Sequence, residues 1–146
     1  MKKLEQICPT LELTLVTQAV NKTSDVSQSI ASLIKKTDAI FISNDNTALS
    51  ALGIIVSLAT KAKMPVFVSD TDAAEIGALA ALGPDQYEIG VQTGEMVVRI
   101  LQGQKIETQN VEFPKVTKFY VNISTAIKLG IEIPKDILKH AVHVTS

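Results

Sequence analysis

The sequence predicts a single α/β domain, residues 1–146, built around a parallel β-sheet. Short apolar runs typical of strands alternate along the chain with longer segments of helical periodicity, and such an alternation favours parallel strands joined by right-handed helical crossovers. With 46% hydrophobic and 20% charged residues, the 146 residues are also sufficient for one globular core. We find no internal repeat and no low-complexity segment that would suggest another architecture.

The first third of the chain contains two predicted helices and two predicted strands. Residues 1–8 (MKKLEQIC) have the pattern of the end of an amphipathic helix, and the alternation in residues 11–16 (LELTLV) predicts a strand. After a turn-rich break, Ser24 is a candidate cap for a helix that ends at Lys35 and Lys36, where cations are favourable. Residues 39–43 (AIFIS) form a continuous apolar run, which is typical of a buried parallel strand.

The middle of the chain contains the clearest predicted helix, residues 46–63. Pro65 prevents this helix from continuing and opens a strand over residues 66–69. Residues 77–82 (GALAAL) suit either a strand or a helical turn. The lone Cys8 is expected to be buried as a small apolar side chain rather than to act as a reactive thiol.

A second long helix is predicted over residues 85–102, and Gly103 ends it. Gly90 and Gly94 are four residues apart, a spacing that allows another backbone to approach closely. One side of the helix is apolar and contains Tyr87, Val91, Gly94, Val97, Val98 and Leu101.

The last third begins with a connector, residues 104–114, which lacks helical periodicity. Residues 118–121 (KFYV) predict a late strand. Asn122 is suited to cap a short helix that ends at Gly130, and Pro134 opens a final helix that extends to about Val142.

Polar clusters directly follow two of the predicted strands, and the carboxyl ends of parallel strands form the ligand-binding edge of an open sheet. We therefore expect one binding site where the two clusters meet. Helix capping is the alternative role for these side chains, with Asp45 or Asn46 as the cap of the first helix and Asp70 or Asp72 in a turn before the next. The candidate ligand-binding residues are Asn44, Asp45, Asn46, Thr47, Asp70 and Asp72.

The chemistry of these clusters suits an amino acid. A carboxylate of the protein accepts charge-assisted hydrogen bonds from the ammonium group of a ligand. A helix N-terminus nearby favours the carboxylate group of a ligand. A zwitterionic ligand uses both kinds of group.

Five segments, in order, resemble one family: SNDNTALSAL, KMPVFVSDTD, GALAALG, GVQTGEMVVRIL and KFYVNISTAIKLGIEIP. They are similar to the substrate-binding proteins of ABC transporters, in the branch with tryptophan- and other aromatic-amino-acid-binding members. The resemblance runs from about Val20 to Leu138. It implies a Rossmann-like lobe of a type I periplasmic binding protein, in which two lobes close over a small solute outside the cytoplasmic membrane. It also implies delivery of an amino acid to an ABC permease, without a cofactor.

The chain departs from the pattern of that family, because an export signal and a complete first lobe are expected ahead of this region. Residues 1–8 begin like an export signal, but Glu5 and Gln6 interrupt it and no apolar stretch follows. The resemblance implies that residues 11–69 and 118–121 belong to the second lobe and that the helix at 85–102 packs on the missing first lobe. Without that lobe, the helix is expected to refold locally, to dock on another protomer or to expose its apolar face. An exposed face of that size favours association, so we expect a homodimer.

Composition disfavours several other classes of protein. A net charge of −1 with scattered basic residues, together with 4% aromatic residues and no Trp, gives no nucleic-acid surface. One cysteine rules out an internal disulfide and a multi-cysteine zinc site, and no apolar run approaches the ~18 residues that span a bilayer. His140 and His143 are three residues apart and suited to one helix face, but they have no third metal ligand nearby.

Two enzymatic or signalling alternatives fit less well than a binding protein. Asp70 and Asp72 resemble the paired aspartates of Mg²⁺-dependent haloacid-dehalogenase-type phosphatases, but Ala74 stands where that pattern continues with Thr or Val. A phosphorylated receiver domain needs an acidic pair after its first strand, and residues 17–19 (TQA) supply none. The non-enzymatic alternative is a truncated product that dimerises and binds no ligand.

Overall fold

The computed structural model describes residues 2–145 and contains a five-stranded sheet in the order β1-β2-β3-β4-β5. The strands are β1 (Ile40–Ile42), β2 (Val66–Val68), β3 (Ala80–Pro84), β4 (Thr117–Asn122) and β5 (Val142–Val144). The predicted α/β fold is confirmed, and β1, β2 and β3 are parallel as expected. The sheet is not parallel throughout, because β4 runs antiparallel to β3, whereas β5 is parallel to β4.

The predicted strand at residues 11–16 is wrong. The chain begins with α1 (Lys2–Ile7) and the 3₁₀ helix η1 (Cys8–Leu11), and residues 12–20 then run outside the sheet. The apolar side chains Leu13 and Leu15 are exposed there. Alternation of apolar and polar residues alone does not make a strand. The backbone N–H and C=O groups of a strand also need a neighbouring strand with which to form hydrogen bonds. Cys8 is a buried free cysteine, as expected.

The predicted second helix is confirmed as α2 (Val26–Leu33), which buries Val26 and Ile30. The prediction that Ser24 caps it is wrong. Ser24 lies inside the 3₁₀ helix η2 (Thr23–Asp25), and its hydroxyl donates to Oδ1 of Asp25 at 3.0 Å instead. A 3₁₀ turn thus precedes the helix in place of a side-chain cap.

The predicted helix at residues 46–63 forms as two pieces, α3 (Asn46–Ser50) and α4 (Leu52–Lys61). They meet at Ala51, whose backbone (φ −107°, ψ 10°) departs from helical geometry and whose side chain is buried. The break lets α4 turn its apolar side onto the sheet. The short 3₁₀ helix η3 (Thr71–Ala74) then follows β2, and the ambiguous residues 77–82 lead into strand β3.

The hydrophobic core lies on one face of the sheet. α2 and α4 pack there against alternate side chains of β1 and β2, which have the burial pattern of buried, exposed, buried along each strand. The opposite face is open: Phe41, Phe67 and Leu82 remain 55%, 38% and 58% exposed. The body of the protein is therefore a sheet whose apolar residues are covered on one side only.

The carboxyl-terminal part is fixed by Asn122, the last residue of β4. Its side chain is fully buried, donates from Nδ2 to the Ala74 carbonyl at 2.8 Å, and accepts from the Thr125 amide at 2.8 Å. As predicted, Asn122 caps α6 (Ile123–Leu129), which ends at Gly130 with a positive φ of 74°. The predicted final helix is too long, because α7 (Lys135–His140) ends early and the chain forms β5, whose backbone groups pair with β4.

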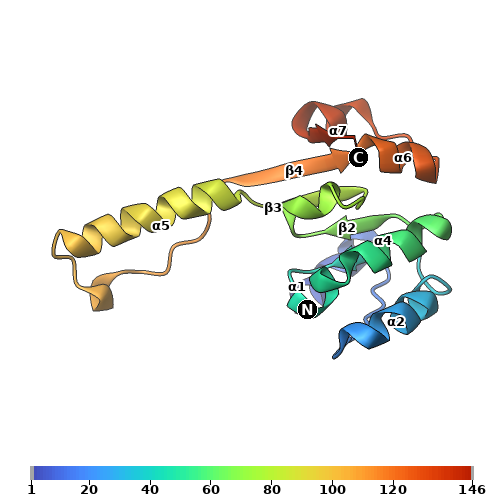
Figure 1. The fold of residues 1–146 in the computed structure, drawn as a ribbon, viewed down its shortest axis with the longest axis horizontal. Helices are drawn as coiled ribbons and strands as arrows, with labels where there is room; N and C mark the ends of the chain where they lie inside the picture. The colour runs from blue at the N-terminus through green and yellow to red at the C-terminus, as the bar shows by residue number, and fades with distance from the viewer. Residues whose placement is uncertain (1, 146) are drawn as a thin grey trace.

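A long arm extends away from this body (Figure 1). It consists of α5 (Gln86–Leu101) and a returning connector that contains the 3₁₀ helix η4 (Ile106–Thr108). Arg99 forms an ion pair with Glu112, and Gln92 Nε2 donates to the Phe113 carbonyl at 3.1 Å, so the connector lies along one side of α5. No residue of α5 is buried, and its predicted apolar side is exposed.

Gly83 in β3 permits a close approach between strands. A Cβ built on Gly83 would lie 2.6 Å from the backbone oxygen of Ser69, whereas one built on Gly53 in α4 meets nothing within 4 Å. We expect Gly83→Ala to lower the free energy of unfolding by about 1–3 kcal/mol through overpacking. Gly53→Ala is the matched control and should raise it by about 0.5–1 kcal/mol, because Ala favours the helix. Urea unfolding of both variants tests this, and an unchanged midpoint for Gly83→Ala would contradict it.

Candidate functional site

The first predicted cluster lies at the carboxyl end of β1, and its aspartate has a defined structural role. Asp45 is the N-cap of α3, and its Oδ1 accepts a hydrogen bond from the Ala48 amide at 2.9 Å. Of the two candidate caps, the structure therefore uses Asp45 and places Asn46 as the first helical residue. Asn44 and Asn46 are exposed, and Thr47 is half-buried.

The second cluster, at the carboxyl end of β2, has the same arrangement. Asp70 is the N-cap of η3, and its Oδ1 accepts from the Asp72 amide at 3.1 Å. Asp72 is exposed, whereas Thr71 between them is buried. In both clusters the N-terminus of a helix orients one aspartate. Each of these two aspartates accepts its capping hydrogen bond, among residues 2–145, through a single carboxylate oxygen.

The parallel register brings the two clusters to the same edge of the sheet. Ile42 pairs with Val68, so the polar residues that follow β1 and β2 leave adjacent strands at the same level. Neighbouring strands lie about 4.8 Å apart, which places the two clusters side by side. Ser69, which directly follows β2, has a buried hydroxyl for which no partner is found within residues 2–145.

A third capping aspartate, Asp85, lies at the same edge and was not among the predicted site residues. It directly follows β3 and is the N-cap of α5, where its Oδ1 accepts from the amides of Tyr87 (2.9 Å) and Glu88 (3.3 Å). Its Oδ2 lies 2.5 Å from Nζ of Lys118, the second residue of β4. The signal in the sequence is an aspartate after each of three successive strands, but the Lys118 partner depends on the antiparallel pairing of β3 and β4.

The Asp85–Lys118 pair connects the two points where the chain enters and leaves the arm. The Asp85 amide also donates to the Val116 carbonyl at 3.0 Å, so backbone and side chains both join these points. The hydrogen bond from Lys118 holds the pKa of Asp85 below its ordinary value, although burial opposes this change and the two α5 amides assist it. The same hydrogen bond raises the pKa of Lys118.

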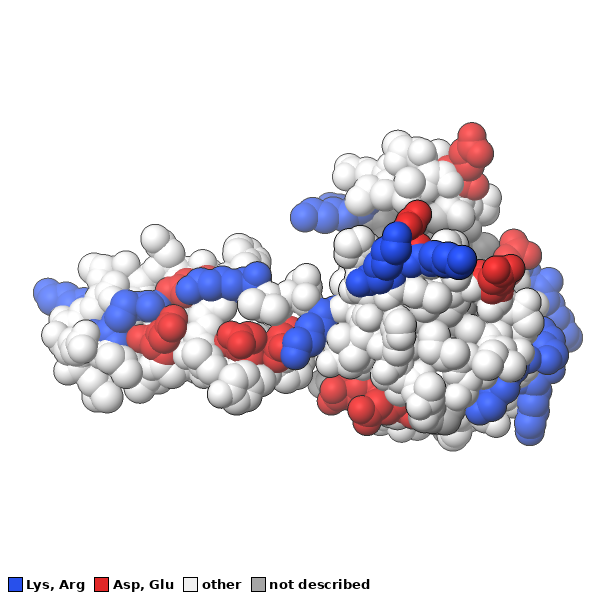
Figure 2. Space-filling model, turned by 90° about the horizontal axis from the view of Figure 1, so that it is seen from above, with Lys and Arg blue, Asp and Glu red and all other residues white. Residues whose placement is uncertain are grey.

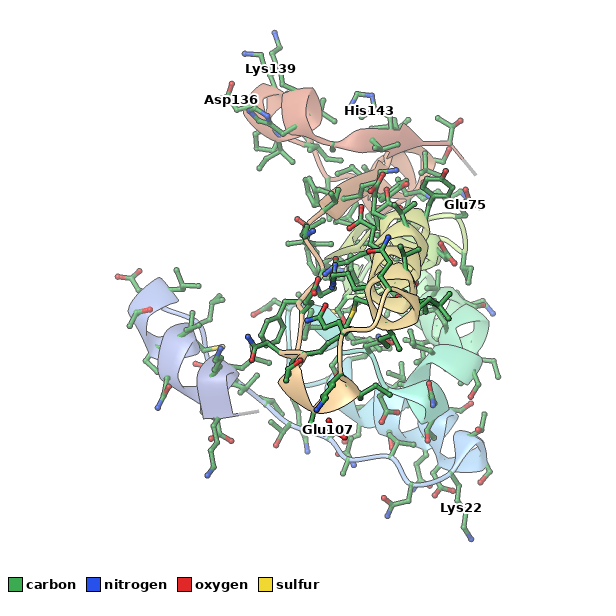
Figure 3. The ribbon with its side chains drawn as sticks, turned by 90° about the vertical axis from the view of Figure 1, so that its left-hand side faces the viewer. Lys22, Glu75, Glu107, Asp136, Lys139 and His143 are labelled. Carbon is green, nitrogen blue, oxygen red and sulfur yellow. The ribbon has the colours of Figure 1, made fainter. Side chains whose placement is uncertain are left out.

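Metal binding has no support in the described part of the chain. Within residues 2–145, no three His, Cys, Asp or Glu side chains are grouped so that they could hold a metal ion. The prediction that His140 and His143 are suited to one helix face is wrong, because His143 lies in β5, where Nε2 is 2.8 Å from the Leu138 carbonyl oxygen. Figure 3 shows Asp136 and Lys139 beside each other on α7, with His143 apart from them.

The carboxyl edge is an open surface rather than an enclosed pocket. Two surface hollows of about 530 and 480 Å³ lie elsewhere, one along residues 5–17 and the other between α4 and α6. The clusters on β1 and β2 line neither of them. We take the edge as the candidate site because it gathers oriented polar groups, as expected of one wall of a cleft.

A family model for ABC transporter substrate binding proteins matches residues 1–145. The chain belongs to this family. Members of the family bind solutes outside the cytoplasm and are not enzymes, as the sequence analysis predicted. Within residues 2–145, no helix has both the length and the apolar character needed to cross a membrane.

Individual relatives agree with that assignment. A tyrosine-binding protein of Clostridioides difficile is 28% identical over 118 residues, which cover 81% of this chain and 34% of that protein. A solved ABC domain from Streptococcus pneumoniae in complex with L-Trp is 34% identical, with a TM-score of 0.87 over 98% of this chain and 50% of that chain. A conserved domain protein from Vibrio cholerae is 34% identical, with a TM-score of 0.90 over 97% and 48% of the two chains.

These comparisons also establish the fold and the extent of the match. The solved neighbours are periplasmic binding protein domains, so the predicted Rossmann-like α/β lobe is confirmed. The chain spans about a third of the length of the C. difficile protein and about half of each solved chain.

The shifted pKa of Asp85 predicts how the stability of the protein depends on pH. Because the folded-state pKa is lowered, the ion pair stabilises the fold above the ordinary aspartate pKa of about 4, and this contribution is lost as the pH falls through the lowered value. Asp85→Asn keeps a capping oxygen but removes the charge. We expect it to lower the urea midpoint at pH 7 and to have a smaller effect near pH 3.

Lys118→Met and the double variant complete a thermodynamic cycle for this pair. Asp85→Asn should lower the free energy of unfolding less in the Lys118→Met background than in the unmodified protein, because the partner charge is already absent there. If Asp85→Asn lowers the free energy of unfolding equally at pH 7 and pH 3, the charge of Asp85 does not stabilise the fold.

Proposed function

We propose that this protein contributes one wall of a binding site for an amino acid in an ABC import system. The observation that carries the proposal is the convergence of Asn44–Thr47 and Asp70–Asp72 at the ends of two adjacent parallel strands. The relatives that bind L-Trp and tyrosine make an aromatic amino acid the first ligand to test. In an intact system, the loaded protein would deliver this ligand to an ABC permease.

The roles of the six candidate residues follow from their local geometry. The caps fix the orientation of Asp45 and Asp70, so their free oxygens are positioned to accept from the ammonium group of a ligand. Asn44 and Asn46 offer amide donors and acceptors, and Thr47 offers a hydroxyl. Asp72 is exposed and uses only its backbone amide in the cap, which leaves its carboxylate for the ligand.

Affinity depends on closing a second wall over the ligand. Ligand sites bury most of the ligand surface, whereas the carboxyl edge of this chain is open. We therefore infer that the 146-residue chain binds amino acids weakly. A longer protein with a first lobe would bind them tightly by closing over them.

A thermal-shift screen of the twenty amino acids tests this proposal. It compares the 146-residue chain with a fusion in which the unmatched part of the S. pneumoniae chain precedes it. We expect one amino acid, L-Trp or L-Tyr first, to raise the melting temperature of the fusion by several degrees and that of the short chain little. Asp72→Ala in the fusion should weaken binding about tenfold, because one charge-assisted bond is worth roughly 1.5–3 kcal/mol.

Asp136→Ala is the matched control, since Asp136 is an exposed aspartate on α7 that is paired with Lys139. This variant should bind as the unmodified fusion does. A folded fusion that no amino acid stabilises would contradict amino-acid capture.

The second candidate function is self-association through the arm. The exposed side of α5 is apolar along its length, and Tyr87 and Leu101 near its two ends are 77% and 81% exposed. A face of this kind favours association. We propose that it packs on a first lobe where one is present and otherwise on a second copy of this chain.

The double variant Val91→Glu/Val98→Glu tests this surface, because both residues lie on the exposed side of α5. We expect the mass of the unmodified chain in sedimentation equilibrium to rise with concentration above that of the 15.7 kDa monomer. The double variant should remain monomeric, since burying two carboxylates opposes association. Gln86→Glu/Thr93→Glu adds the same charge off this face and should still associate. A chain that is monomeric at all concentrations would contradict the proposal.

A further inference from the structure

Lysine side chains gather at the amino edge of the sheet, opposite the candidate binding site. Lys35 and Lys36 follow the end of α2, Lys61 and Lys63 lie at the end of α4, and Lys128 is in the last turn of α6. All five are exposed. Figure 2 shows a band of basic side chains at the right-hand end of the body, which is the end remote from the arm. We call these five residues the amino-edge lysines.

Stabilisation of helix ends explains only part of this group. A cation near the C-terminus of a helix interacts favourably with the helix dipole. One lysine at each helix end is enough for this interaction. Lys63 has a structural task, because its Nζ donates to the Lys128 carbonyl at 2.5 Å and so binds the end of α6. The ion pairs of residues 2–145 involve none of the five lysines, so their charges face solvent without a carboxylate partner.

The charges of the two sheet edges are opposite in sign. Asp45, Asp70 and Asp72 lie at the carboxyl edge, whereas the lysines at the amino edge outnumber the acidic residues on the loops there, Asp38 and Glu75. The protein therefore has a net charge near zero, but the two edges of its sheet differ in the sign of their charge. Such a separation orients a protein in front of a charged surface.

The surface between α4 and α6 suits phosphate groups. It forms the shallow hollow of about 480 Å³. Two lysines (Lys61 and Lys128), one carboxylate (Glu75) and three hydroxyl-bearing residues lie on its lining, so cations outnumber anions there; the hydroxyl-bearing residues are Ser57, Thr60 and Thr125. Ammonium groups with neighbouring hydroxyls are donors to phosphate oxygens. The hollow is open, so it suits the headgroups of a surface rather than an enclosed ligand.

We propose that the amino edge docks on an anionic lipid surface through these lysines. A lipid surface fits better than an acidic protein, because stable protein interfaces centre on Trp, Tyr or Arg anchors. The amino-edge lysines are spread point charges on three helix ends, to which mobile headgroups can adjust. Docking there leaves the carboxyl edge and the arm pointing away from the membrane, so this state is distinct from the one in which the edge would deliver a ligand to a permease. The proposal does not depend on which ligand the edge binds.

Co-sedimentation with lipid vesicles tests this proposal on the 146-residue chain. The vesicles contain phosphatidylcholine with or without phosphatidylglycerol. At low salt we expect binding to the anionic vesicles alone, and loss of this binding at about 1 M salt, where screening acts within roughly 3 Å. Lys35→Gln/Lys36→Gln/Lys61→Gln/Lys128→Gln should reduce partitioning at least about tenfold.

Two controls make the result specific. Lys2→Gln/Lys3→Gln/Lys105→Gln/Lys135→Gln changes the net charge equally and should keep partitioning within about twofold of the unmodified chain. Lys35→Arg/Lys36→Arg/Lys61→Arg/Lys128→Arg keeps the charge and should also keep binding, which separates loss of charge from loss of fold. Equal binding to both vesicle types, no binding to anionic vesicles at low salt, or equal loss in the control variant would each overturn the proposal.

Discussion

The parallel hydrogen bonding of β1, β2 and β3 is the constraint on which the arrangement of this protein depends. Because these strands run in one direction, their carboxyl ends and the helix N-termini that follow share one edge of the sheet. The C-terminal ends of α2, α4 and α6 lie at the other edge, whereas α5 extends away from the body. Asp45, Asp70 and Asp85 therefore begin α3, η3 and α5 at one end of the body, and the amino-edge lysines lie at the other. A shift of one residue in this register would also turn Val66 and Val68 out of the core.

The core covers one face of the sheet, and this accounts for the apolar surface elsewhere. α2 and α4 bury alternate residues of β1 and β2, while Phe41 and Phe67 remain exposed on the opposite face. Burial of one large apolar side chain stabilises a protein by about 1.5–3 kcal/mol. The apolar side chains exposed on the open face and on the arm do not contribute this free energy to the stability of the fold.

Asp85 joins the body to the arm and has a different character from Asp45 and Asp70. All three aspartates cap a helix, but only Asp85 is nine-tenths buried and has a cationic partner in Lys118. Its two oxygens are both engaged, one by α5 and one by β4. We infer that Asp85 positions the arm, whereas the caps at the exposed Asp45 and the half-buried Asp70 each use one carboxylate oxygen.

The sequence by itself determined the features that depend on neighbouring residues. Apolar runs located β1 and β2, Asn122 and Gly130 bounded α6, and the polar clusters after two strands located the candidate edge. Only the tertiary structure decided which strands pair. It left residues 12–20 outside the sheet, formed β5 beside β4, and brought Lys118 to Asp85. The physical reason is that caps and periodicity act over a few residues, whereas strand pairing joins backbone groups that are distant in the chain.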